Sequence, residues 1–163
     1  MLRRLLSTDQ SRTSFAQRAL LGLVMFPHGA QKLLGWFGGY GFTGTMGYFT
    51  DTLHFPAPLA ALVILAEALG SLGLVLGLGT RVAAFGIAAV MVGAVLTTHL
   101  SVGFFMNWFG NQPGEGFEYH LLALGLALPL LVRGGGAWAL DHAALALLTR
   151  KASESADVAK QLS

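Results

Sequence analysis

Apolar residues occur along the chain in four long runs, separated by shorter polar or glycine-rich stretches. The runs cover about residues 15–34, 58–78, 82–99 and 117–133. A helix that crosses a lipid bilayer needs about 20 mostly apolar residues. The pattern therefore predicts an all-α membrane protein, folded as a bundle of four transmembrane helices that occupy these runs.

The rest of the chain divides into a lead-in, a long loop and a tail around one membrane domain at residues 15–142. Residues 1–14 are polar and basic. Residues 143–163 begin apolar and amphipathic and end in a polar run, which predicts a partly disordered tail. The loop at 35–57 is rich in glycine and aromatic residues, so it is either an aromatic belt at the membrane interface or a flexible lid over a pocket.

Composition agrees with this pattern and adds an orientation. The chain is 54% hydrophobic and 11% charged, and its mean hydropathy is +0.63. The basic residues gather before the first run, after the fourth run and at Arg81 in the short second connection. By the positive-inside rule both termini lie in the cytoplasm. The charges form no stripe, so we expect the lipid bilayer, and no nucleic acid, as a partner.

The sequence contains no cysteine. This excludes a thiol nucleophile, disulfide exchange and cysteine ligation of an iron–sulfur cluster by this chain. Any redox reaction at this protein therefore takes its electrons from a partner, a bound cofactor or a substrate.

Glu67 is the most informative residue, because it lies inside a stretch that carries no other charge from Pro58 to Thr80. A charge at the centre of a bilayer costs at least about 2.5 kcal/mol, so such a residue is a candidate for function. With a rise of about 1.5 Å per residue, Glu67 lies roughly 13 Å and His28 roughly 12 Å below the same predicted interface. This arithmetic predicts His28 as the partner of Glu67. Lys32 shares the helical face of His28, four residues later.

Three further ionisable residues fall in the outer layer of the predicted bundle: His99, Glu118 and His120. Glu118 and His120 are two residues apart and so cannot share a helical face. Together with Lys32, this layer predicts a polar funnel that opens to the outer leaflet and has His28 and Glu67 at its floor. The alternative, that each group only bonds a neighbouring helix, stays open.

The chain resembles the DoxX family of membrane proteins over roughly residues 18–141. The resemblance is carried by PHGAQKLLGWFGGYGFTG at 27–44, AEALGSLGLVLGLGTR at 66–81, THLSVGFF at 98–105, GFEYHLL at 116–122 and GGGAWALD at 134–141. It implies a four-helix bundle in the prokaryotic inner membrane, in a redox setting. The family includes a subunit of a thiosulfate:quinone oxidoreductase. His120 departs from the family pattern and adds a titratable group.

These observations favour a membrane oxidoreductase, or a subunit of one, that binds a quinone and handles its protons. An apolar environment raises the pKa of carboxyl groups in general towards the range where they exchange protons. Glu67, His28 and Lys32 are the expected catalytic residues. The expected ligand-binding residues are His99, Glu118, Tyr119, His120, Trp36, Phe37 and Tyr40.

Two other functions stay open at this point. The chain is alternatively a structural subunit or adaptor of a larger membrane redox complex, without catalysis of its own. It is alternatively a haem or copper carrier that uses the outer-layer histidines. A redox partner subunit and a homo-oligomer are compatible with each reading, and no dedicated metal ligands are assigned.

Overall fold

The regular structure is helical throughout the residues that the computed structural model describes, which are 2–161. Side chains are described for residues 2–153 and 155. Four long helices coincide closely with the predicted runs, and the prediction of an all-α fold is confirmed. They are α2 (Arg12–Leu34), α4 (Ala57–Leu76), α5 (Thr80–Ala94), which continues as η3 (Val95–His99), and α6 (Glu118–Arg133).

The ends of these helices follow from local sequence signals. Ser11 caps α2, since its hydroxyl oxygen accepts a hydrogen bond from Ser14 N at 3.2 Å. α4 has a proline in its first turn and ends at Gly77, whose φ of 68° is the left-handed conformation that favours glycine. Gly79, at φ 60°, completes a tight turn into α5, so α4 and α5 form an antiparallel hairpin.

The four long helices pack as a bundle in which α2 contacts α4 and α6, and α5 contacts α4 and α6. The core is made of alanine, leucine, isoleucine and methionine side chains, among them Leu21, Met25, Leu74, Ala84, Ile87, Met91 and Leu130. α2 approaches α4 most closely at two glycines. A Cβ atom added to Gly29 would lie 2.6 Å from Ala68 Cα, and one added to Gly22 would lie 2.8 Å from Val75 N.

Two of the helices are long and apolar enough to cross a membrane, namely α4 and the continuous helix Thr80–His99. Both present large apolar side chains to the surroundings, including Leu62, Leu65, Leu69, Phe85, Val92 and Leu96. A contiguous apolar face of this kind is unfavourable in water and is typical of a surface that contacts lipid or protein. These helices support a membrane location.

The predicted loop at 35–57 is more regular than its glycine content suggests. It contains η1 (Trp36–Gly38), α3 (Gly41–Gly47) and η2 (Tyr48–Thr52), which fold back against the ends of α2 and α4. Phe49 anchors this segment, because it is buried and its ring stacks on Phe55 at a centroid distance of 5.8 Å. Trp36 and Phe37 are exposed.

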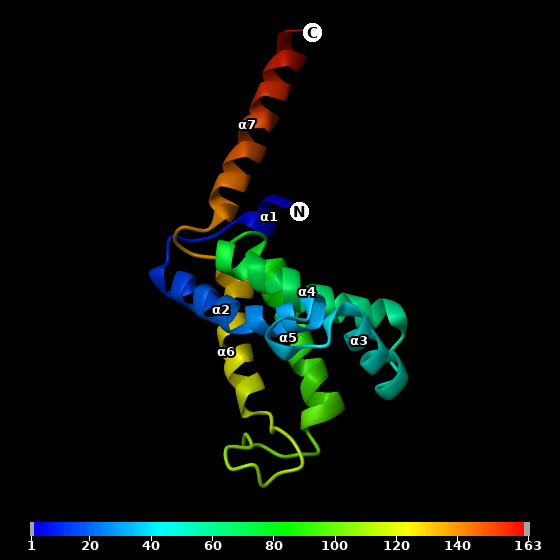
Figure 1. Cartoon of the computed structure of the whole chain (residues 1–163). Coiled ribbons are helices and arrows are strands. Elements are labelled where there is room, and N and C mark those ends of the chain that lie inside the picture. The colour runs from blue at the N-terminus through cyan, green and yellow to red at the C-terminus, as the bar shows by residue number, and fades with distance from the viewer. Residues whose placement is uncertain (1, 162–163) are drawn as a thin grey trace.

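The terminal segments lie together at one end of the bundle. α1 (Leu2–Leu6) contacts α7 (Leu140–Gln161), and α7 extends away from the other helices, opposite the loop at 100–117 (Figure 1). The sequence predicts a short amphipathic helix and then disorder in this tail, whereas the structure has one helix as far as Gln161. Residues 162–163 lie outside the described residues.

Candidate functional site

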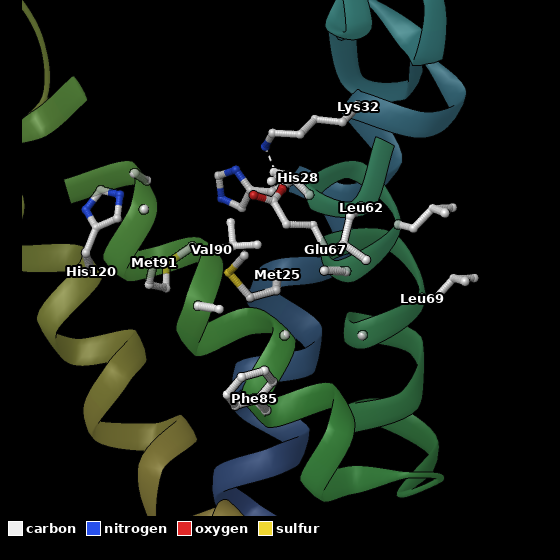
Figure 2. Close-up of a pocket in the computed structure, with 18 of the residues that line it drawn as sticks. Met25, His28, Lys32, Leu62, Glu67, Leu69, Phe85, Val90, Met91 and His120 are labelled. Carbon is white, nitrogen blue, oxygen red and sulfur yellow. Dashed lines mark hydrogen bonds and ion pairs between the residues drawn. The ribbon is translucent and has the colours of Figure 1, made fainter. Parts of the chain in front are cut away.

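An ion pair between α2 and α4 lies at the centre of the candidate site. Lys32 Nζ lies 2.6 Å from Glu67 Oε2, and the side chains are 27% and 5% exposed. In Figure 2 the two side chains point towards one another and His28 lies beside them. The nearly buried carboxylate that the sequence singles out therefore has a charged partner.

The predicted depth of Glu67 agrees with the structure, while its ion-pair partner differs from the predicted one. Gly29, adjacent to His28, packs directly against the backbone of Glu67 and Ala68, so the two predicted levels coincide. The ion pair is nevertheless made by Lys32. Helical side chains lean towards the N-terminus of their helix, and the long lysine chain thereby reaches back to the level of residue 28.

A cavity of about 1110 Å³ adjoins this ion pair. Its walls come from α2, α4, α5 and α6, together with Tyr48, Phe49 and the loop at 100–117. Most lining side chains are apolar, such as Met25, Leu62, Val63, Leu69, Phe85, Val90 and Met91. The titratable side chains on the wall are His28, Lys32, Tyr48, Glu67, His99, Glu115, Tyr119 and His120.

His28 connects the ion pair to the aromatic side of the cavity. Its ring is exposed to the space, and the ring centroid lies 6.0 Å from that of Tyr119. The Tyr119 hydroxyl donates to the sulfur of Met25 at 3.1 Å. Met25, His28 and Lys32 follow a spacing of three and four residues along one face of α2. Met25 was not predicted as a site residue, although this spacing is the sequence signal that identifies it.

The two histidines predicted for one layer are neighbours on the cavity wall. The ring centroids of His99 and His120 are 4.2 Å apart, and His99 Nδ1 lies 2.8 Å from the Glu115 carbonyl oxygen. His120 is 6% exposed, and its buried Nδ1 has no hydrogen-bond partner among the described residues. Among the described side chains, of residues 2–153 and 155, no group of three His, Cys, Asp or Glu is placed to hold a metal ion.

Four residues predicted for ligand binding lie outside this cavity. The Glu118 carboxylate accepts a hydrogen bond from Trp108 Nε1 at 3.3 Å, on another face of α6 than His120. Trp36 and Phe37 are exposed at the end of α2 and do not line the cavity. Tyr40 lines a second cavity next to α3. Of the residues predicted to form the funnel, only Glu118 lies off the cavity wall. Tyr48 and Phe49 line the cavity in place of the predicted Trp36, Phe37 and Tyr40.

In comparisons with known proteins, both residues of the ion pair lie within the segment that matches a protein family. A family model described as DoxX matches residues 14–100, which include His28, Lys32, Glu67 and His99. The chain is also similar to a protein of Bacillus subtilis (strain 168) named "Putative oxidoreductase CatD". The two are 29% identical over 113 residues, which cover 69% of this chain and 74% of the relative. No solved structure matches the chain.

Proposed function

The chain belongs to the DoxX family, and we propose that it is a membrane oxidoreductase, or the membrane subunit of one, that binds a quinone in the large cavity. The observation that carries this proposal is the Lys32–Glu67 ion pair on the wall of an apolar cavity of about 1110 Å³. Ligand sites in proteins are typically apolar cavities of about 300–1,000 Å³ with a few polar groups on the wall.

The position of the cavity favours a ligand that is dissolved in the membrane. Leu62, Leu69 and Phe85 line the cavity and are also exposed on the outer surfaces of α4 and α5. The space thus extends to the apolar face that we expect to contact lipid. A quinone has an apolar tail and a polar headgroup, which match the apolar wall and the ion pair.

A bound quinone supplies reversible chemistry of two electrons and two protons. The residues of this chain then hold and move the protons. Glu67 gives a proton to, or takes one from, a headgroup oxygen, and Lys32 stabilises the carboxylate and any negative charge that develops nearby. His28 donates a hydrogen bond towards the same oxygen from the cavity side. Electrons come from a partner subunit or from a second substrate.

A binding experiment with a matched pair of glycine variants tests ligand occupancy. Gly93 lines the cavity and Gly125 does not, and a Cβ atom at either position has no neighbour within 4 Å. We expect Gly93→Leu to raise the Kd for a short-chain quinone in lipid nanodiscs at least about tenfold, which corresponds to 1.4 kcal/mol. Gly125→Leu is the control and leaves the Kd unchanged. The same Kd in both variants would contradict quinone binding in this cavity.

A kinetic experiment tests the role of the carboxylate. Purified protein is assayed for quinol oxidation with an artificial electron acceptor, and Glu67→Gln is compared with the natural sequence. A positioned acid or base contributes about 10²–10⁴-fold to a rate, so the variant is expected to lose at least about 10²-fold in kcat. Equal kcat values in the Glu67→Gln variant and the natural protein would show that Glu67 does not transfer the proton. An unaltered Kd in this variant separates proton transfer from binding.

The other functions predicted from the sequence give different results in the same preparations. An adaptor without catalysis binds no quinone and co-purifies with a redox subunit in mild detergent. The haem or copper alternative is supported by the adjacent rings of His99 and His120. It predicts a visible absorption band or bound copper that is lost in His120→Ala.

A further inference from the structure

A second cavity, of about 630 Å³, lies on the other side of Lys32 from the large cavity. It is lined by the end of α2, residues 38–40, α3 and η2. Lys32, Tyr48 and Phe49 line both cavities, so these three side chains form the wall between them.

The second cavity differs from the first in the chemistry of its wall. It is lined by four glycines, by Phe49 and by seven side chains that carry a polar group, namely Gln31, Lys32, Tyr40, Thr45, Tyr48, Asp51 and Thr52. Tyr40 is 86% exposed and Asp51 is exposed, so the cavity reaches the surface of the molecule. A space of this size with many polar partners holds water.

We propose that the second cavity is a water-filled access path through which protons pass between the surface and the Lys32–Glu67 ion pair. The ion pair is asymmetric, since Glu67 is 5% exposed whereas Lys32 is 27% exposed and faces both spaces. Lys32 is therefore the group through which water in the second cavity reaches the buried carboxylate. This proposal rests on the proposed function for the destination of the proton.

Each proton passes from the surface to the ligand in three transfers, which leave the charges of the ion pair as they were at the start. The Lys32 ammonium passes one proton across the 2.6 Å hydrogen bond to the Glu67 carboxylate, which leaves both groups neutral. A proton that enters from the surface, relayed by water in the second cavity, then protonates the amine. Glu67 donates its proton to the ligand oxygen in the large cavity, and it becomes a carboxylate again beside the restored ammonium. Oxidation of the ligand reverses each step.

The absence of natural cysteines allows a direct test of water access. Lys32→Cys and Gln31→Cys each place one thiol on the wall of the second cavity, and both positions are only half-buried. A membrane-impermeant sulfonated maleimide is added to the protein in nanodiscs. Ser71→Cys is the reference, because Ser71 is fully buried and lines neither cavity. We expect both wall thiols to react at least about tenfold faster than the reference, since buried thiols are inert.

A plug in each cavity identifies the route of the reagent. Gly47 lines only the second cavity, has a helical φ of −57°, and an added Cβ atom would meet only Asp51 Oδ2 at an ordinary 3.7 Å. Gly47→Leu therefore fills this cavity without strain. We expect it to slow the labelling of both wall thiols about tenfold, while Gly93→Leu and Gly125→Leu leave the labelling unchanged. Labelling that is insensitive to Gly47→Leu, or absent at both thiols, overturns the access path.

The quinol oxidation assay tests whether water access through the second cavity is needed for proton transfer. Gly47→Leu is expected to lower kcat several-fold with an unchanged Kd for the quinone, whereas Gly93→Leu raises the Kd. An unchanged kcat in a Gly47→Leu variant whose labelling is blocked overturns the role in proton transfer. If labelling is blocked by the plug but no quinone binds, the access path stands and the proposed function falls.

Discussion

At the scale of single residues, Arg18 shows how backbone carbonyl groups accommodate a buried cation that forms no ion pair with the described side chains. It is 1% exposed. Its guanidinium donates to the carbonyl oxygens of Gly135 at 2.8 Å, Leu74 at 3.0 Å, Val75 at 2.7 Å and Ala137 at 3.2 Å. These oxygens belong to the end of α4 and to the segment before α7. The sequence predicts Arg18 only as a charge that sets orientation, because nothing in the chain reveals carbonyl groups that lie far apart in sequence.

We expect Arg18→Lys to destabilise the bundle. Lysine keeps the charge but lacks the planar fork that serves several acceptors at once. Each lost hydrogen bond to a charged group is worth about 1.5–3 kcal/mol, so the free energy of unfolding should fall by at least about 2 kcal/mol. Thermal unfolding in detergent measures the loss. Arg12→Lys at an exposed position is the control and should change the free energy by less than about 0.5 kcal/mol.

The coupling between Lys32 and Glu67 should be measurable as a free energy of unfolding. Lys32→Met leaves a carboxylate that is 5% exposed without its partner, and removal of one member of a buried pair costs about 3–5 kcal/mol. Glu67→Leu is expected to cost less, because the freed ammonium can turn into the second cavity. The double variant should recover most of the loss, which a double-mutant cycle measures. Additive losses would show that the two charges are not coupled.

At the scale of helices, the seam between α2 and α4 sets the geometry of the ion pair. Gly22 and Gly29 are seven residues apart on one face of α2, and each leaves no room for a side chain against α4. Small residues at such positions let helix backbones approach closely in membranes. The seam was not predicted from the sequence, because it is formed by two glycines that stand among apolar residues of α2.

Gly29→Ala should therefore move α4 away from α2. Its Cβ atom would lie 2.6 Å from backbone atoms of Ala68, which cannot give way as a flexible side chain does. Overpacking of this kind costs about 1–3 kcal/mol, and the shift would also lengthen the contact between Lys32 and Glu67. We expect a lower Tm together with weaker quinone binding. Gly125→Ala, in open surroundings, should affect neither measurement.

The helices and the site differ in how far the sequence predicts them. The long helices are predictable because glycine and proline bound their apolar runs at residues such as Gly35, Pro56 and Gly77. The helical turns at 36–52 are missed, because glycine has a low helix propensity and the burial of Phe49 holds them in place instead. His99 and His120, predicted for one outer layer, are in ring contact in the structure. The choice of Lys32 over His28 for Glu67 depends on side-chain reach, which counting along the helix axis does not include.

At the scale of the whole molecule, the lengths of the helices bear on the number of membrane spans. α4 and the helix Thr80–His99 satisfy the length and hydropathy of a span. α6 has 16 residues. A helix of this length measures roughly 24 Å and is shorter than the roughly 30 Å of a hydrocarbon core. The exposed aromatic residues before α6, such as Trp108 and Phe109, are typical of a membrane interface and lie where they would extend it.

Single cysteines distinguish four spans from two in this cysteine-free chain. Asn107→Cys reports the loop before α6, Leu78→Cys the turn between α4 and α5, and Ser155→Cys the exposed surface of α7. Each variant is treated with an impermeant maleimide in intact cells and again after lysis. We expect labelling of Asn107→Cys in intact cells, and labelling of the other two only after lysis.

The reason lies in how the chain alternates between the two ends of the bundle. In both topologies the loop at 100–117 and the turn at 77–79 lie on opposite sides of the membrane, because one span separates them. If α2 and α6 also cross, α7 lies on the side of the turn, at the end where α1 and α7 meet (Figure 1). If only α4 and α5 cross, α7 shares the side of the loop. Labelling of Ser155→Cys together with Asn107→Cys in intact cells would therefore contradict four spans, and labelling together with Leu78→Cys would confirm them.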